Sequence, residues 1–322
     1  MQKSLDRQQE RYADHRQAEQ AVVKRNNVPV GKVIRKNLVA YLFLLPALLG
    51  FALFSVYPII SSFIIGFQYY DMVNPPRWVG FFNFVTVLRN PLLLISVENC
   101  FTFLLWALIP FLIPFFMAMI VNELPRWGGY LRFTYYLPAI LPPVVTFYLW
   151  KWMYDPSGAG LINVFLASLH LPTLAWLDSP TTVIPSMAFI GIWGGTGSGM
   201  LIYLAALQNI PPHLYDAAEI DGASIWRKFW HITLPQMRII LLLNLMFAIM
   251  GAFQTFDGPF LLTGGGPVNS SVTPVLLVYK YAFEQGNYGA ANALSLILFA
   301  FLMIFSILYL YLMRRTTGLG KY

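Results

Sequence analysis

The stretch Pro211-Pro212-His213-Leu214-Tyr215-Asp216-Ala217-Ala218-Glu219-Ile220-Asp221-Gly222-Ala223 is a polar segment between two very apolar ones, and it continues to Pro235. Prolines suit the first turn of a helix, where the N–H groups need no intrahelical partner. Leu214, Ala217, Ala218 and Asp221 follow with helical spacing and predict one face of a short helix. Gly222 stands where helices commonly end in a left-handed residue.

A second helical pattern follows this glycine. Ile225, Phe229 and Ile232 recur on one side, with Trp226 and Trp230 beside them. The proline at position 235 predicts the end of this second helix. The stretch is therefore expected to form two short helices joined at Gly222, standing between two membrane spans.

The whole stretch resembles the EAA loop of permeases of ATP-binding-cassette (ABC) importers. The pattern of that loop is Glu-Ala-Ala, then Asp-Gly-Ala three positions on, then Phe and Leu-Pro. Asp216 stands here in place of the usual Glu. The matching positions are Ala217, Ala218, Asp221, Gly222, Ala223, Phe229, Leu234 and Pro235. The flanking sequence is similar to the sugar branch of the family, of the maltose and glycerol-3-phosphate type.

This resemblance covers essentially the whole chain and implies an all-α fold, the six-helix type I ABC importer permease. It implies that the first loop helix docks in a cleft of a cytoplasmic ATPase subunit, with Gly222 setting the angle to the second helix. The ATPase-coupling residues would be Asp216, Ala217, Ala218, Glu219, Asp221, Gly222 and Ala223. The implied partners are a second homologous permease, two ATPase subunits that bind ATP and Mg, an extracytoplasmic solute-binding protein and a sugar.

The resemblance leaves the identity of the sugar open. It extends to the permeases for alginate oligosaccharides, which are acidic sugars. No motif selects an acidic over a neutral sugar, and few basic residues fall in the predicted path.

Composition independently predicts a polytopic membrane protein. The 322 residues are 57% hydrophobic and only 11% charged, against about 25% charged in soluble domains. A span needs roughly 20 apolar residues, and six uncharged tracts approach or exceed that length. These tracts are 38–70, 99–122, 133–150, 179–215, 239–256 and 285–313. The expected organisation is one membrane domain over 38–315, with tails at 1–37 and 316–322.

The basic residues predict the orientation of these spans. Counting by predicted loops, 17 of the 21 Lys and Arg residues fall on one side. Since cytoplasmic loops carry the excess of basic residues, both termini and the 211–235 loop are expected in the cytoplasm. The net charge of +7 is therefore a topology signal, and a nucleic-acid partner is not expected. The resemblance to importer permeases implies that the spans lie in the bacterial inner membrane, in contact with lipid.

Prolines predict an interruption in the third tract. Pro138, Pro142 and Pro143 lie within six residues, so backbone hydrogen bonding should break there. The external segment that follows has a short amphipathic run from Leu161 to Leu169.

Small residues mark the fourth and fifth spans. The fourth carries Gly191, Gly194, Gly195 and Ser198, and the fifth carries Ala248, Gly251, Ala252 and Thr255. Small residues at helical spacing allow close helix packing. In the resembled maltose-type permeases, the corresponding positions include ones that face the sugar, which implies a substrate path. Both readings stay open. Asp257, after the fifth span, is predicted in a polar vestibule along this path, or as a simple interfacial acid.

The sequence lacks the motifs of several kinds of enzyme and metal site. The phosphate-binding pattern Gly-x-x-x-x-Gly-Lys-Ser/Thr does not occur, so this chain is not expected to be an ATPase or other enzyme. The four histidines lack metal-ligand spacing, so no metal is expected. The alternative function is a self-contained secondary sugar carrier or channel, although such carriers commonly need intramembrane ionisable groups. A membrane enzyme using His213, Asp216 and His231 is a weaker alternative.

Overall fold

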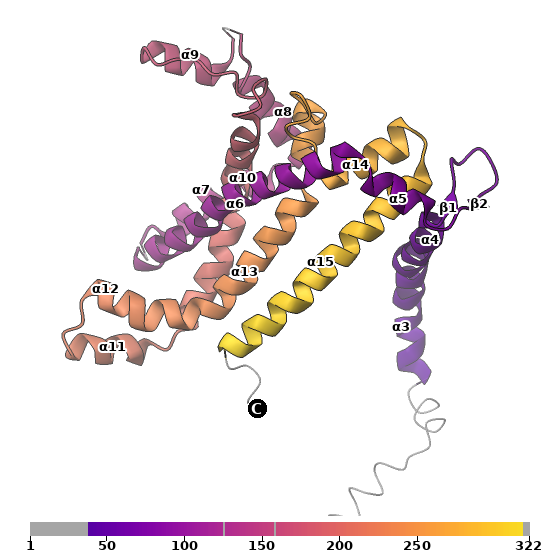
Figure 1. Ribbon diagram of the computed structural model, residues 1–322. Helices are drawn as coiled ribbons and strands as arrows, with labels where there is room; N and C mark the ends of the chain where they lie inside the picture. The colour runs from indigo at the N-terminus through magenta and orange to yellow at the C-terminus, as the bar shows by residue number, and fades with distance from the viewer. Residues whose placement is uncertain (1–37, 125, 158, 318–322) are drawn as a thin grey trace, which may run out of the picture. The chain divides into compact units, whose positions relative to one another are not determined.

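The computed structural model describes residues 38–124, 126–157 and 159–317. The tail expected at 1–37 and the end of the chain at 318–322 lie outside the described residues. Within the described part, helices dominate and one short hairpin of two strands occurs (Figure 1). The elements that begin the chain are α3 (Leu38–Phe51), the π-helical turn η1 (Ala52–Val56), α4 (Tyr57–Gly66), β1 (Gln68–Tyr69), β2 (Arg77–Trp78) and α5 (Phe82–Leu88).

The remaining elements of the described chain are all helices. The elements are α6 (Pro91–Glu123), α7 (Gly128–Ile140), α8 (Pro143–Met153), α9 (Leu161–Ser168), α10 (Val183–Gln208), α11 (Pro212–Ile220), α12 (Ile225–Lys228), η2 (Phe229–Thr233), α13 (Leu234–Gln254), η3 (Pro259–Thr263), α14 (Pro274–Tyr279), η4 (Lys280–Glu284) and α15 (Tyr288–Thr317). The described residues divide into two compact units between Ser61 and Ser62. The first unit holds α3, η1 and the start of α4, and the second holds all the sites discussed below.

Five helical stretches in the described residues are long and apolar enough to cross a membrane. Their bounds are Tyr41–Gly66, Pro91–Glu123, Val183–Gln208, Ile225–Thr263 and Tyr288–Arg315. Each of them overlaps one of the six predicted tracts, which confirms five predicted spans as helices of membrane-crossing length.

The third predicted span is different, because residues 133–150 do not form one helix. α7 ends at Ile140 and α8 begins at Pro143, with Leu141 and Pro142 in extended conformations at ψ 135° and 136°. A proline disfavours the helical conformation in the residue before it, so two consecutive prolines extend two consecutive residues. The predicted break is confirmed, but the span consists of two helices of 13 and 11 residues.

Two hydrophobic clusters hold the centre of the second unit, where α10 packs against α6 and α7 (Figure 1). The first cluster joins α6, α8 and α10 and includes Phe103, Trp150, Val183 and Met187. The second joins α6, α10 and α13 and includes Phe115, Met200, Tyr203, Leu207 and Met237. Parts of the 211–235 loop pack against the second cluster, which connects the loop to the helical core.

The predicted amphipathic run after the third span is confirmed as helix α9. Asn163 is buried on its inner side, donates to the Leu174 carbonyl at 3.0 Å and accepts from the Trp176 indole N–H at 2.9 Å. Val164 and Phe165 are exposed. The helix is thus held in place by its one buried amide.

Candidate functional site

The 211–235 stretch begins with the helix that the sequence predicts. α11 starts at Pro212 after the extended Pro211 and ends at Ile220. Gly222 has φ +68°, its N–H donates to the Glu219 carbonyl at 3.0 Å, and the Ala223 N–H donates to the Ala218 carbonyl at 2.9 Å. This pair of bonds is a Schellman motif. The prediction of a left-handed glycine at position 222 is therefore confirmed.

Only part of the helix face that the sequence predicts is turned toward the core. Leu214, Tyr215 and Ala218 are half-buried, whereas Ala217 and Asp221 are exposed. Leu214 and Tyr215 pack against the second cluster. Tyr215, which the helical pattern in the sequence did not include, adds to this contact, and its hydroxyl lies 3.0 Å from Thr233 Oγ1.

The predicted end of the second loop helix is wrong. The helix does not stop at Pro235: α12, η2 and α13 follow one another without a gap from Ile225 to Gln254. The π-helical turn η2 places the Leu234 N–H on the Phe229 carbonyl, five residues back. Pro235, the second residue of α13, follows this π-helical turn directly, so the helix continues past a residue that has no backbone N–H. The second loop helix and the fifth span are one continuous helical segment.

An ion pair joins the two helices of the loop. Lys228 Nζ lies 3.1 Å from Glu219 Oε2, with side-chain exposures of 21% and 78%. Ser224 caps α12 by accepting from the Arg227 N–H at 3.4 Å. These contacts hold α11 against the start of the fifth span.

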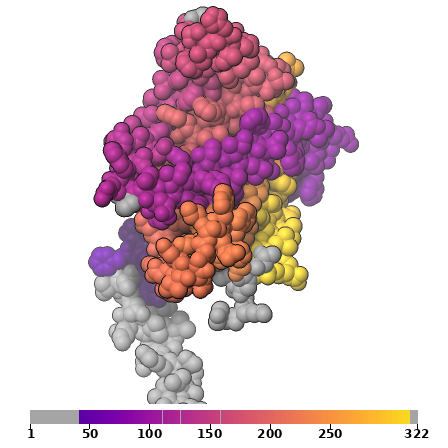
Figure 2. Space-filling model, turned by 90° about the vertical axis from the view of Figure 1, so that its left-hand side faces the viewer, coloured from indigo at the N-terminus to yellow at the C-terminus, as the bar shows by residue number. Residues whose placement is uncertain are grey.

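The outer surface of the loop is apolar and acidic. Ile220, Ile225, Trp226 and Trp230 are exposed by 57% to 88%. Among the predicted coupling residues, Asp216, Ala217, Glu219, Asp221 and Gly222 are exposed, and Ala218 and Ala223 are half-buried. Figure 2 shows this part of the chain, in orange, as a bare surface below the band formed by α6 and α7. Large exposed apolar patches mark interaction sites.

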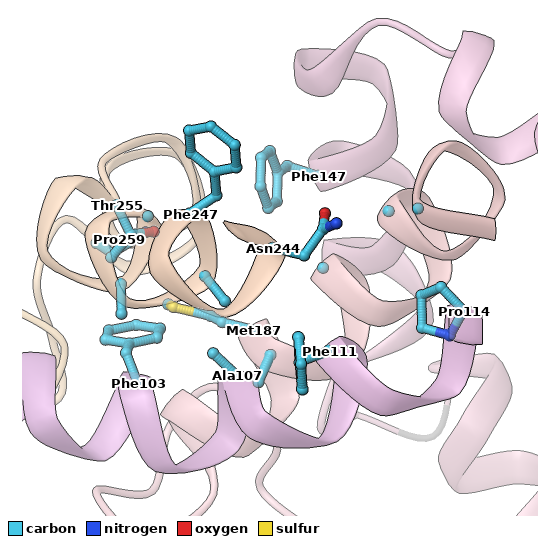
Figure 3. A pocket seen from close by; sticks show the side chains of 18 of the residues that line it. Phe103, Ala107, Phe111, Pro114, Phe147, Met187, Asn244, Phe247, Thr255 and Pro259 are labelled. Carbon is cyan, nitrogen blue, oxygen red and sulfur yellow. The ribbon is translucent and has the colours of Figure 1, made fainter. Parts of the chain in front are cut away.

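A cavity of about 460 Å³ lies between four of the helices. α6 lines it with Phe103, Ala107, Phe111 and Pro114, as Figure 3 shows. α8 contributes Phe147. α10 and α13 supply most of the remaining wall, which is formed by Met187, Ala188, Gly191, Gly195, Gly199, Tyr203, Asn244, Phe247, Ala248, Gly251, Ala252, Thr255, Gly258 and Pro259.

Six of the nine predicted path residues line this one cavity. These are Gly191, Gly195, Ala248, Gly251, Ala252 and Thr255. Gly194, Ser198 and Asp257 are not among the lining residues. Ser198 and Asp257 are exposed and Gly194 is half-buried. The two stripes of small residues, Gly191 to Gly195 and Ala248 to Thr255, are far apart in the chain and are brought together in space.

The glycines of α10 and α13 differ in what lies beside them. A Cβ added at Gly191, Gly194, Gly195 or Gly251 would meet nothing within 4 Å, so these residues are not helix-packing contacts within this chain. A Cβ at Gly197, by contrast, would overlap the backbone of Tyr135 in α7. A Cβ at Gly199 would lie 3.0 Å from the Pro114 Cβ in α6. The packing interpretation therefore applies to Gly197 and Gly199, and open space lies beside the predicted path glycines Gly191, Gly194, Gly195 and Gly251.

The aromatic and polar lining was missed from the sequence, although a signal was present. Tyr203 follows Gly199 by four positions, and Asn244 precedes Ala248 by four. Extending each small-residue stripe by one turn would have found both side chains. The wall from α6 and α8 carried no such signal.

Metal binding finds no support in the described residues. No group of three or more His, Cys, Asp or Glu side chains in that part of the chain is close enough to hold an ion. Asp155, outside the spans, is engaged locally instead, and hydrogen bonds from Ser157 lower the pKa of its carboxyl.

Comparison with known proteins places this geometry in a family. The family described as "Binding-protein-dependent transport system inner membrane component" matches residues 111–318, which contain α7 to α15, the loop and most of the cavity. The chain belongs to this family. It is therefore an inner membrane component of a binding-protein-dependent transport system, and its long apolar helices are the membrane spans.

Relatives of this inner membrane component cover nearly all of it. The trehalose/maltose transport system permease protein MalF of Thermococcus litoralis is 32% identical over 288 residues, 88% of this chain and 97% of the relative. The arabinooligosaccharides transport system permease protein AraP of Bacillus subtilis is 30% identical, over 88% of this chain and 91% of the relative. The sulfoquinovosyl glycerol permease SmoG of Agrobacterium fabrum is 29% identical.

One solved structure confirms the fold of this inner membrane component. A chain of a bacterial ABC transporter involved in the import of the acidic polysaccharide alginate superposes with a TM-score of 0.80 at 24% identity, over 89% of this chain and 98% of that one. The expected type I ABC importer permease fold is thus confirmed.

Proposed function

We propose that this protein forms half of the translocation path of an ATP-driven importer of sugars or oligosaccharides. One observation carries the proposal: the cavity and the coupling loop share two helices. α10 lines the cavity with Gly191 and Gly195 and leads into α11. α12 leads through η2 into α13, which lines the cavity with Ala248 and Gly251. A displacement of the loop therefore acts on both glycine-bearing walls.

The proposed coupling partner is a cytoplasmic ATPase subunit. Ile220, Ile225 and Trp226 present apolar surface, and the Asp216 carboxylate beside them is exposed. Such a surface favours docking in an apolar cleft with a basic rim. The ATPase subunits would bind ATP and Mg, and this chain would hydrolyse none. The excess of basic residues on the same side of the predicted spans supports a cytoplasmic position for the loop.

The proposed cargo is a sugar, released to the path by an extracytoplasmic solute-binding protein. The named relatives that transport maltose, trehalose and arabino-oligosaccharides support this class. The cavity supports it physically, because its volume of about 460 Å³ falls in the range of small-molecule sites, and such sites are mostly apolar with a few polar groups. A second homologous permease would close the open side of the path.

The test is co-purification followed by reconstitution. The tagged chain, expressed from its own host, is purified in mild detergent, and its companions are identified by mass spectrometry. We expect an ATPase and a second permease, with ATP hydrolysis stimulated by a sugar-loaded binding protein. Uptake of sugar into vesicles by this chain alone, without ATP, would instead establish the secondary-carrier alternative.

A further inference from the structure

The lining of the cavity is uncharged and mostly apolar. Among its lining residues there is no Asp, Glu, Lys, Arg or His, and three carry hydrogen-bonding side chains: Tyr203, Asn244 and Thr255. Four phenyl rings form much of the remaining wall, those of Phe103, Phe111, Phe147 and Phe247. Burying a carboxylate here would be costly because none of the described lining residues is a cation.

Tyr203 stands out among these groups. Its side chain is only 2% exposed, and its hydroxyl is buried with no hydrogen-bond partner among the described residues. A buried hydroxyl without a partner costs about 1–3 kcal/mol. The indole N–H of Trp150 is in the same situation, but Trp150 does not line the cavity.

Packing holds the Tyr203 ring at the cavity wall. The ring lies edge-on to Phe115, with centroids 5.6 Å apart, and Tyr203 belongs to the second cluster. It comes one turn after Gly199 on α10, toward the end that leads into the coupling loop. Asn244 on α13 is positioned similarly, because its Nδ2 donates to the Ile240 carbonyl at 2.9 Å. Its amide keeps a carbonyl oxygen and a second N–H for other partners.

We propose that the Tyr203 hydroxyl, together with the Asn244 amide, binds a hydroxyl group of an uncharged sugar unit at the coupling-loop end of the cavity. This inference rests on the proposed function. A sugar hydroxyl both donates and accepts, as does a tyrosine hydroxyl. Since the Tyr203 oxygen is shielded from water in this conformation, the new bond replaces an unsatisfied state. The phenyl rings of the lining take the apolar faces of the sugar.

The test is Tyr203→Phe in the complete reconstituted importer, with maltotriose, arabinotriose and an alginate trisaccharide as probes. For the neutral trisaccharide that the wild type transports, we expect KM to rise about tenfold, the worth of one hydrogen bond, with little change in kcat. The apparent unfolding temperature without sugar should stay the same or rise, because an unsatisfied hydroxyl is removed. An unchanged KM would overturn the proposal.

Tyr309→Phe is the matched control. The Tyr309 hydroxyl donates to the Leu242 carbonyl at 2.7 Å, and the residue does not line the cavity. We expect this variant to lower the unfolding temperature and to leave KM unchanged. If Tyr203→Phe behaves in the same way, its hydroxyl has a structural role and the proposal is wrong.

Deoxy analogues of the transported trisaccharide identify the hydroxyl that is bound. We expect one deoxy analogue to bind the wild type more weakly than the parent trisaccharide does, but to bind Tyr203→Phe as strongly as the parent does. If every analogue instead binds Tyr203→Phe more weakly than the parent does, so that the two losses add, the pairing is overturned. A wild type that transports only the alginate trisaccharide would contradict the uncharged-sugar assignment. A wild type that transports none of the probes with ATP would contradict the proposed function itself, and this outcome is distinct from an unchanged KM in the variant.

Discussion

The backbone of Tyr135 lies so close to Gly197 that a Cβ at Gly197 would overlap the Tyr135 carbonyl oxygen and lie 2.7 Å from the Tyr136 Cα. This contact joins α7 to α10 shortly before the helix is interrupted at Leu141 and Pro142. It fixes the helix that lines the cavity against its neighbour, while Gly195, two residues earlier, has open space beside it.

Gly197→Ala should therefore destabilise the protein. The two backbones must separate to admit a methyl group, and overpacking of this kind typically costs about 1–3 kcal/mol. We expect a lower apparent unfolding temperature of the detergent-purified protein. Gly195→Ala is the control, and its unfolding temperature should match or exceed that of the wild type, because alanine favours the helix and meets no atom there. Equal losses in the two variants would contradict the assignment of Gly197 as a packing glycine.

Gly251→Leu should reduce the transport of long sugars more than that of short ones. The position lines the cavity, and a Cβ added there would meet no atom within 4 Å, so a leucine side chain starts into open space of the cavity. We expect kcat/KM for a tetrasaccharide to fall about tenfold relative to a disaccharide, which corresponds to about 1.4 kcal/mol. Gln254→Leu, at an exposed position on the same helix outside the lining, should change neither. Equal effects on both sugars would favour a packing role for Gly251.

Gly222→Pro should abolish coupling while the spans still insert. Proline is restricted to a φ near −65°, whereas Gly222 has φ +68°. The substitution also removes the N–H that donates to Glu219. We expect loss of sugar uptake and of the ATPase activity stimulated by the binding protein, with normal amounts of chain in the membrane fraction. Gly222→Asn should retain most activity because asparagine tolerates left-handed conformations. Normal uptake by Gly222→Pro would remove the loop from the mechanism.

The ion pair between Glu219 and Lys228 allows the two carboxylates of α11 to be told apart. A pair as exposed as this one contributes at most about 1 kcal/mol to stability. Because Glu219 is held by Lys228, we expect Glu219→Lys to impair stimulated ATPase activity and the added change Lys228→Glu to restore most of it. Asp216→Lys should not be rescued by Lys228→Glu. Failure of the double swap at 219 and 228 would indicate that Glu219 meets the ATPase directly.

Features decided by a few consecutive residues were predictable from the sequence. The Schellman motif at Gly222 involves only Ala218 to Ala223, and the break between α7 and α8 follows from two adjacent prolines. Spans longer than 18 residues follow from hydropathy because lipid requires long apolar helices. Where a local rule failed, at Pro235, a π-helical turn carried the helix through a residue that usually ends one.

Only the tertiary structure decided which residues share a cavity and which glycines pack. A helix sequence shows that residues lie on one face, but which neighbour that face meets depends on contacts between segments far apart in the chain. Gly195 and Gly197 are both glycines of one stripe-bearing helix, yet one borders open space and the other touches α7. The phenyl wall from α6 and the unsatisfied Tyr203 hydroxyl likewise arise from the packing of α6, α10 and α13, because burial and hydrogen-bond partners are properties of assembled helices.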